Sequence, residues 1–215
     1  MIKKIVLPLA LSIAAFSPAH ADTIGFVVGT GSWSQETTGN ISAGAIPTTT
    51  MSSGGDSSTM WAEVEHPVPM LPNVRIAQAP LSASNTSGDS LVLDHTDTTL
   101  YYELLDNWVT ADVGLTFRSI SGSLTAGTSA PINVTVPMIY AKAAVEVPAS
   151  GFSAGVIMNQ ISGYTDMSTY VAYEMSFGLG VQVGTRSQNI DLAEGTDVTS
   201  AIEASGSFMN LYYHF

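Results

Sequence analysis

Apolar and polar residues alternate along the last part of the chain. Met209, Leu211, Tyr213 and Phe215 share one parity, and the residues between them are mostly polar. A two-residue period places the first set on one face of a β-strand. The sequence therefore predicts an amphipathic final strand that ends on an aromatic residue.

The same alternation predicts ten strands in all. Most are close to the ~9–11 residues that a tilted strand needs to cross a bilayer. We expect the sixth to begin after Pro137, because proline has no N–H to donate to a ladder. The predicted strands are residues 24–32, 59–65, 73–79, 98–105, 109–118, 138–147, 152–159, 169–175, 179–186 and 208–215.

In these predicted strands the charged residues lie on the face opposite to the apolar residues. In the fifth, Val113, Leu115 and Phe117 share one parity, and Asp112 and Arg118 share the other. A charged side chain that faces lipid at mid-membrane costs ~2–4 kcal/mol, so a bilayer imposes this separation. The pattern favours a barrel that is apolar outside and charged within. The alternative is a secreted β-sandwich, which buries its apolar face in a core.

The connections between the predicted strands alternate in length. The long ones, 33–58, 80–97, 119–137 and 187–207, are rich in Ser, Thr and Gly, and the short ones are 66–72, 106–108, 148–151 and 176–178. Long outer loops and short periplasmic turns are typical of outer-membrane barrels. We therefore expect an all-β fold, a transmembrane antiparallel up-and-down β-barrel of about ten strands. Eight strands is the alternative if two weak segments are not strands.

The beginning of the chain has the pattern of a cleaved export signal. Lys3 and Lys4 precede a short apolar run, and a small-x-small motif follows at residues 19–21. We expect residues 1–21 to be the signal peptide and residues 22–215 to form one barrel domain in the outer membrane of a Gram-negative bacterium.

Composition narrows the possible functions. The sequence has no cysteine, which excludes a disulfide framework and a thiolate metal site. Removal of Lys3 and Lys4 with the signal leaves four of the six basic residues against 18 acidic ones, a net charge of −14. Such a chain is a poor nucleic-acid binder, because phosphate contacts need Lys and Arg.

Three segments of the chain are distinctive: WAEVEHPVPMLPNV at 61–74, YYELLDNWV at 101–109 and NLYYHF at 210–215. In these segments the chain resembles a family of small, uncharacterised outer-membrane β-barrel proteins of gamma-proteobacteria. The Gly54-Gly55 pair is similar to a Gly-Gly feature of that family. The resemblance covers most of the mature chain and implies its location and fold. It transfers no catalytic residue, because the family has no established activity.

Charged residues of the inward parity gather near the turn-side ends of the strands. We expect an acid-rich group in the periplasmic half of the lumen, with Arg75 and Lys142 as its counter-charges. This group forms either a satisfied polar plug or a narrow cation-preferring path. The predicted lumen charge cluster comprises Glu63, Glu65, Arg75, Glu103, Asp112, Arg118, Lys142, Glu146, Glu174 and Arg186.

Two predicted loops carry weaker candidates. His95 lies beside Asp94 and Asp97, as in a water-activating pair of ten-stranded outer-membrane proteases, but no second pair matches it. A second loop carries three carboxylates whose spacing matches no known calcium loop, which favours a solvated loop. They are Asp191, Glu194 and Asp197.

We expect a non-enzymatic outer-membrane barrel with a charge-filled lumen and Ser/Thr/Gly-rich outer loops. A narrow pore for ions or small solutes is the alternative, and an outer-rim hydrolase acting on peptides or lipid A is third. No cofactor or metal is expected. The expected partners are outer-membrane lipids including lipopolysaccharide, periplasmic chaperones, and the barrel-assembly machinery. The assembly machinery would read Met209, Leu211, Tyr213 and Phe215.

Overall fold

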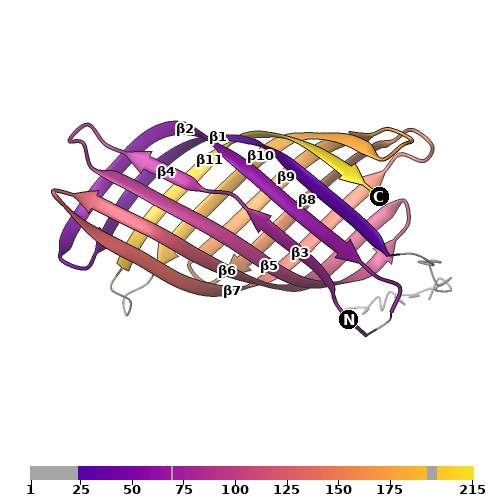
Figure 1. Ribbon diagram of the computed structural model, residues 1–215, viewed down its shortest axis with the longest axis horizontal. Helices are drawn as coiled ribbons and strands as arrows, with labels where there is room; N and C mark the ends of the chain where they lie inside the picture. Colours follow the sequence, from indigo (N-terminus) through magenta and orange to yellow (C-terminus); the bar gives the residue numbers. More distant parts are fainter. Residues whose placement is uncertain (1–23, 69, 193–197) are drawn as a thin grey trace, which may run out of the picture.

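A closed antiparallel β-barrel makes up the part of the chain that the structure describes (Figure 1). The structure is a computed structural model and describes residues 24–68, 70–192 and 198–215. The predicted export signal lies outside these residues. Within them the structure contains no helix, and so none that crosses a membrane.

Eleven strand segments follow one another around the wall. They are β1 (Gly25–Ala43), β2 (Ile46–Glu65), β3 (Asn73–Gln78), β4 (Leu81–Ser84), β5 (Ser90–Asp106), β6 (Val109–Ala126), β7 (Thr128–Glu146), β8 (Phe152–Ile161), β9 (Tyr164–Glu174), β10 (Leu179–Leu192) and β11 (Val198–His214).

The short segments β3 and β4 share one place in the wall. Both pair with β5, and the break between them falls at Ala79 and Pro80. The ring closes because β3 also pairs with β2, where Arg75 lies opposite both Glu63 of β2 and Thr99 of β5. The prediction of ten strands is therefore confirmed over the eight-strand alternative.

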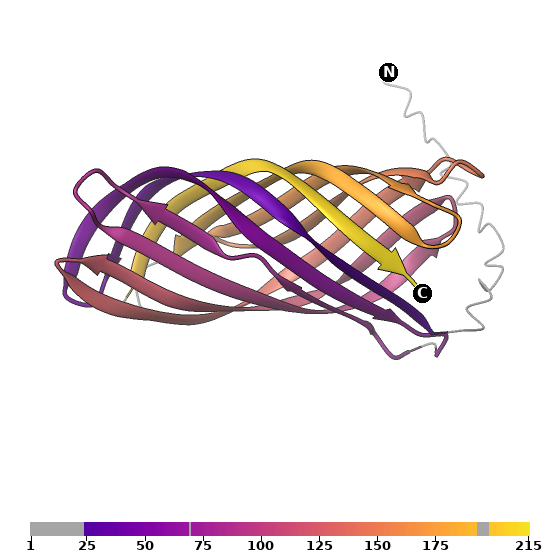
Figure 2. The ribbon, with the colours of Figure 1, turned by 45° about the horizontal axis from the view of Figure 1, so that its top comes forward.

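The strands run much further than the sequence analysis predicted (Figure 2). Strand β2 has 20 residues. At ~3.3 Å per residue and a tilt of ~40°, it reaches about 50 Å along the barrel axis, roughly twice the ~25 Å apolar band of outer-membrane barrels.

The predicted long loops are consequently wrong. Residues 33–58 form one hairpin that turns at Gly44 and Ala45, and residues 119–137 form another that turns at Gly127. Residues 80–97 contain β4 and the start of β5. Most of 187–207 lies in β10 and β11, and 193–197 lie outside the described residues.

The sixth predicted strand also begins earlier than expected. Pro137 lies inside β7, opposite Phe117 of β6. Strand β8 pairs with β7 only from Ile139 onwards, so β7 has a single neighbour at Pro137. A missing N–H is tolerated on such an unpaired edge, which the sequence argument did not anticipate.

Aromatic side chains pack in pairs at one end of the barrel. We call the end with Phe215 the proximal end and the opposite one the distal end. At the proximal end Phe215 donates its backbone N–H to the carbonyl of Phe26 over 2.9 Å, and their rings lie 5.4 Å apart. Phe152 and Tyr173 form a second ring pair there, with centroids 4.7 Å apart. These aromatic residues match the interfacial girdle of outer-membrane barrels.

Strand β6 changes its apolar face along its length. Near the proximal end Leu115 points outward and is 52% exposed, while Asp112 points inward and is 1% exposed. Nearer the distal end Ser121 points outward, while Ile120 and Leu124 are buried inside the barrel. The two-residue alternation continues along the whole strand, but the apolar residues change from the outward face to the inward face.

All the long strands share this switch, which divides the barrel into two parts. We call the proximal part, with its apolar outer face, the apolar band, and the distal part, with its polar outer face, the extension. The inside of the extension is an apolar core, and burial there removes apolar side chains from water where the outer face of the wall is polar. The core comprises Trp33, Ile41, Ala43, Ile46, Met51, Leu81, Ala83, Leu91, Leu93, Ile120, Leu124, Ile132, Met138, Tyr164, Ile190, Val198, Ile202 and Ala204.

Candidate functional site in the barrel lumen

The proximal half of the lumen holds two ion pairs. Arg75 of β3 pairs with Glu63 of β2, its partner across the ladder. Lys142 of β7 lies 3.4 Å from Asp112 of β6, again across a ladder. Both predicted counter-charges thus lie beside acidic residues of the predicted lumen charge cluster.

The other acidic residues of this half lie closer to the proximal mouth. Glu65 accepts a hydrogen bond of 3.1 Å from the hydroxyl of Tyr101, and Glu103 pairs with Asp112 in the β5–β6 register. Glu174 lies 3.6 Å from the ring of His214 at the rim. Glu146, at the end of β7, is exposed.

Arg118 and Arg186 do not join this group, although the sequence analysis placed them in the same cluster. The Nε and Nη2 atoms of Arg118 donate to the two carboxylate oxygens of Asp97 over 2.6 and 2.5 Å. Nη2 also donates to Asp166 over 2.5 Å, and Nη1 donates to the hydroxyl of Tyr164 over 2.7 Å. Arg118 is completely buried.

Arg186 completes this buried network from β10. Its Nε and Nη2 atoms donate to the two oxygens of Asp166 over 2.9 and 2.7 Å. Gln188 donates to the same carboxylate over 3.0 Å. Two guanidinium groups thus face the carboxylates of Asp97 and Asp166, so that charge is balanced, as a buried ionic network requires. We call these residues, together with His95, the ion network.

His95 lies inside the barrel and not in an outer loop, so that prediction is wrong. It is 4% exposed on β5. Its Nε2 atom lies 3.4 Å from Nη2 of Arg186 and 3.4 Å from the amide nitrogen of Gln188. Because these two groups only donate, Nε2 is the acceptor and the ring is neutral.

His95, Asp97 and Asp166 each offer a ligand atom within 4.8 Å of the others, which is close enough for a metal ion. The carboxylate oxygens, however, already accept hydrogen bonds from Arg118 and Arg186. A cation would have to displace a guanidinium group from each carboxylate. The arrangement therefore fits a structural network better than a metal centre.

The apolar core closes the lumen on the distal side of the ion network. The guanidinium of Arg186 lies 5.0 Å from the ring centroid of Trp33, and that of Arg118 lies 5.0 Å from the ring of Tyr164. Both aromatic residues belong to the core. The charged groups are thus covered by aromatic faces, which favour cations.

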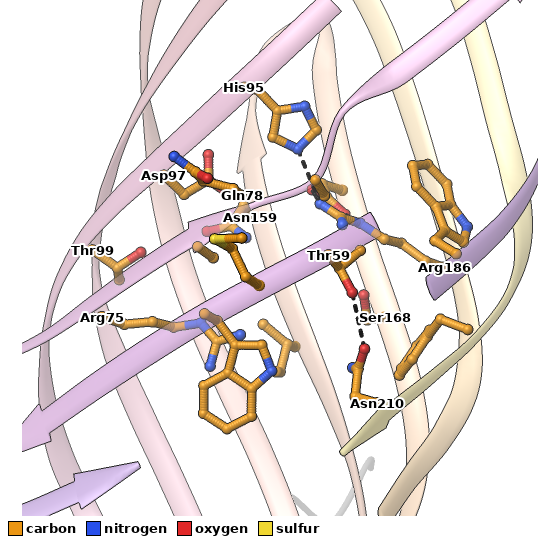
Figure 3. Close-up of a pocket in the computed structure, with 18 of the residues that line it drawn as sticks. Thr59, Arg75, Gln78, His95, Asp97, Thr99, Asn159, Ser168, Arg186 and Asn210 are labelled. Carbon is orange, nitrogen blue, oxygen red and sulfur yellow. Dashed lines mark hydrogen bonds and ion pairs between the residues drawn. The ribbon is translucent and has the colours of Figure 1, made fainter. Parts of the chain in front are cut away.

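A cavity of about 80 Å³ lies on the proximal side of the ion network (Figure 3). Arg75 and Arg186 approach it from opposite sides, and Thr59 donates to Asn210 across its floor over 3.0 Å. The lining also includes Trp33 and Trp61. At ~10–15 Å³ for each water, the cavity has room for roughly five to eight water molecules.

The predicted loop with three carboxylates is only partly described by the structure. Asp191 lies on β10 with its side chain exposed on the outside of the barrel. Glu194 and Asp197 lie outside the described residues. Met209 and Leu211, which the sequence analysis predicted to be read by the assembly machinery, point outward from β11 in the apolar band.

Sequence reasoning left Asp97 and Asp166 out of the lumen charge cluster because it placed both residues in connections between strands. Their parity carried usable information. Asp97 lies an even number of residues from Glu103 on β5, so both side chains point into the lumen. Asp166 has the same relation to Glu174 on β9. Extending each strand on that parity, instead of ending it where the outer face turned polar, would have brought both carboxylates into the lumen.

Comparison with solved structures identifies the class of fold. Outer membrane protease OmpT from Escherichia coli matches with a TM-score of 0.55 and 11% identity, over 91% of this chain and 98% of that one. The described chain has the fold of an outer-membrane β-barrel. At this identity the comparison shows the fold alone.

Two other barrels match less closely. Neisserial surface protein A matches with a TM-score of 0.42 and 11% identity, over 88% of this chain and 97% of that one. The translocator domain of the autotransporter NalP from Neisseria meningitidis matches with a TM-score of 0.43 and 10% identity, over 92% and 91%. No family model and no curated protein sequence matches the chain.

Proposed function

We propose that this protein is a non-enzymatic, non-conducting outer-membrane barrel that holds a rigid, hydroxyl-rich extension above the membrane. One observation carries the proposal, the apolar core that fills the extension from wall to wall. A hydrated ion crossing this core would lose its water without gaining polar partners, which costs far more than thermal energy.

A narrow cation-preferring pore is the second candidate. The acid-rich proximal half of the lumen favours it, because Glu63, Glu65 and Asp112 outnumber the bases beside them. Such a path would have to continue past Arg118 and then through the core, and both are fully buried. A pore therefore requires displacement of the core from the wall.

An enzyme acting on peptides or lipid A is the third candidate. The His–Asp arrangement that would carry it, His95 with Asp97 and Asp166, lies beneath the apolar core and is engaged by two arginines. A peptide at the distal rim has no route to it through that core. These contacts support a structural role for the three residues.

Single-channel recording in planar bilayers tests the proposal. We expect the purified barrel to insert without conductance steps, whereas a general porin in the same bilayers gives steps. Asp112→Asn is the informative variant, because it neutralises a lumen carboxylate without touching the core. Cation-selective steps in the natural protein that lose their selectivity in Asp112→Asn would establish the pore and overturn the proposal. Cleavage of peptides or of lipid A that is lost in His95→Ala would establish the enzyme instead.

The proposal includes the finer features expected from the sequence. These are a cleaved signal at residues 1–21, assembly through the final strand, and membership of the gamma-proteobacterial family with the Gly54-Gly55 pair. Contact with lipopolysaccharide would run through hydroxyl groups or bridging cations, because all four basic residues of the described chain point inward. These residues are Arg75, Arg118, Lys142 and Arg186.

A further inference from the structure

One strand of the extension has an edge that no other strand covers. Strand β7 pairs with β6 along nearly its whole length, whereas β8 pairs with it only from Ile139 onwards and ends at Ile161. Among the described residues, no second strand pairs with β7 between Pro131 and Pro137. We call the edge of this stretch that faces away from β6 the free edge.

The backbone groups of every second residue of β7 point to the free edge. The N–H of Glu146 donates to the carbonyl of Trp108 on the β6 side over 2.8 Å, and the N–H of Val147 donates to the carbonyl of Phe152 on the β8 side over 2.8 Å. The ladder between β6 and β7 has no register shift, so this alternation continues to the distal end. The odd-numbered residues therefore direct their N–H and C=O groups to the free edge. They are Pro131, Asn133, Thr135 and Pro137.

The free edge offers more acceptors than donors. All four residues have a carbonyl there, but Pro131 and Pro137 have no N–H, so Asn133 and Thr135 supply its only two donors. The side chains of all four are exposed, and no hydrogen bond within the described residues reaches these backbone groups. A partner that supplies N–H groups in a regular row therefore fits this edge.

The side chains of β7 set the pattern of such a partner. Val134 and Val136 point inward and are only partly buried against the core, whereas Asn133 and Thr135 point outward. Residues that lie opposite each other in an antiparallel pair share one face of the sheet. A strand on the free edge would therefore bury apolar side chains beside the two valines and place every second residue on the outside.

The outside of the extension is acidic. In the part of the chain that the structure describes, no basic residue points outward, as Arg75, Arg118, Lys142 and Arg186 all face the lumen. Cationic partners are favoured by such a surface, over a range of about 8 Å at physiological ionic strength. The exposed carboxylates on the outside of the extension are Glu36, Asp56, Asp94, Asp191 and Glu203.

One of these carboxylates lies near the proximal end of the free edge. The turn between β8 and β9 lies there, because Gln160 is opposite Ile139 of β7. Asp191 of β10 donates its backbone N–H to the carbonyl of Gly163 in this turn over 2.7 Å. A basic side chain on the outer face of an added strand would thus find a carboxylate across the turn.

A second copy of the chain fits the free edge poorly. Antiparallel pairing of two free edges about Val134 would set Pro131 opposite Pro137, so that carbonyl groups would face each other without donors. Two barrels in one membrane also have β7 running in the same direction, which excludes antiparallel pairing between them. Prolines protect edge strands from their own copies in this way.

We propose that the free edge binds an extended polypeptide of alternating apolar and basic residues, which adds to β7 as an antiparallel strand. Its apolar side chains lie beside Val134 and Val136, and its basic side chains lie on the acidic outside. Its N–H groups donate to the four carbonyls of the free edge. This inference does not depend on whether the barrel conducts.

Fluorescence anisotropy of a labelled peptide as long as the free edge, made of alternating lysine and valine, tests the proposal. With the barrel in neutral maltoside micelles, we expect saturable binding of one peptide for each barrel, weakened by added salt. A peptide of alternating glutamate and valine should not bind. Equal binding of the two peptides would overturn the charge preference, and no saturable binding of the lysine peptide would overturn the proposal.

Backbone methylation of the peptide separates strand addition from attraction by charge alone. On the free edge the lysines lie opposite the odd-numbered residues of β7 and direct their N–H groups to it. N-methylation of two lysines should weaken binding about tenfold, by removing two hydrogen bonds. N-methylation of two valines is the control and should weaken it much less, because their N–H groups point away from β7. Equal losses would overturn strand addition.

A pair of variants tests the same contact from the barrel. Asn133→Pro removes an N–H from the middle of the free edge without touching the ladder to β6, and we expect the lysine peptide to bind about tenfold more weakly. Asn133→Ala keeps that N–H and should leave the affinity unchanged. Equal affinities of the two variants, both of them folded by heat-modifiable gel mobility, would contradict the assignment.

A third variant adds donors, and it serves as the test if Asn133→Pro does not fold. Pro131→Thr with Pro137→Thr gives the free edge two more N–H groups, so the lysine peptide should bind more tightly. Unchanged or weaker binding would overturn the proposal. Light scattering of the natural protein checks for the other occupant. A dimer that dissociates in Asn133→Pro would identify a second copy on the free edge and overturn the proposal.

Discussion

The Nη2 atom of Arg118 lies 2.5 Å from Oδ2 of Asp166, although two strands separate β6 from β9 around the wall. The contact therefore spans the lumen and ties distant parts of the barrel to each other. Both side chains are at most 3% exposed. The ion network is thus a cross-brace at the level where the apolar band gives way to the extension.

Removing Asp166 should destabilise the barrel strongly. Asp166→Asn leaves two guanidinium groups with one carboxylate, and breaking a buried pair in this way costs about 3–5 kcal/mol. We expect a corresponding loss in the free energy of unfolding, measured by urea titration in detergent with heat-modifiable gel mobility as the readout. Asp191→Asn, on the outside of β10, is the control and should change it by less than ~0.5 kcal/mol. Equal stabilities would contradict a bracing role.

Truncations in the core and on the lipid face should differ in cost along one strand. Leu124→Ala leaves a void in the core of the extension, and such a change costs about 2–5 kcal/mol. Leu115→Ala removes the same atoms from the outer face of the apolar band, where lipid fills the space, so the loss should be clearly smaller. Urea unfolding in the same detergent compares the two. A larger loss at Leu115 would mean that the core of the extension is not packed.

A methyl group at Gly29 should displace Trp61. A Cβ atom there would overlap the indole ring, which packs on the bare backbone of β1. We expect Gly29→Ala to cost about 1–3 kcal/mol, as overpacking does, and to shift tryptophan emission to longer wavelength. Gly54→Ala is the control, because its Cβ would meet its nearest neighbour at an ordinary 3.5 Å. Unchanged emission in Gly29→Ala would show that Trp61 does not pack there.

The strands of the apolar band could be predicted from the sequence, because apolar residues occupy every second position where the wall faces lipid. Val113, Leu115 and Phe117 lie outside and Asp112 lies inside, as predicted. The segregation of charge from lipid fixes the parity, since a single slip of register would place Asp112 in hydrocarbon. The strand count and the closed barrel follow from that pattern.

The strands of the extension could not be predicted in the same way, because a strand was recognised only where its outer face is apolar. At Ser119 the outer face turns polar and the inner face turns apolar, so the lipid-facing pattern stops while the strand continues. Asp97 and Asp166 were lost with the ends of their strands. The pairing of Arg118 with Asp166 across the lumen depends on the barrel radius, and no local pattern in the sequence carries it.

The switch of the apolar face is the central claim, and the absence of cysteine makes it directly measurable. Single cysteines at outward positions of β6, at Leu115, Phe117, Ser121 and Ser123, can each carry a fluorescent label in the folded barrel. With brominated phospholipids, we predict strong quenching at Leu115 and Phe117 and little at Ser121 and Ser123. A water-soluble quencher should give the opposite order. Lipid quenching that continues through Ser121 and Ser123 would contradict the account.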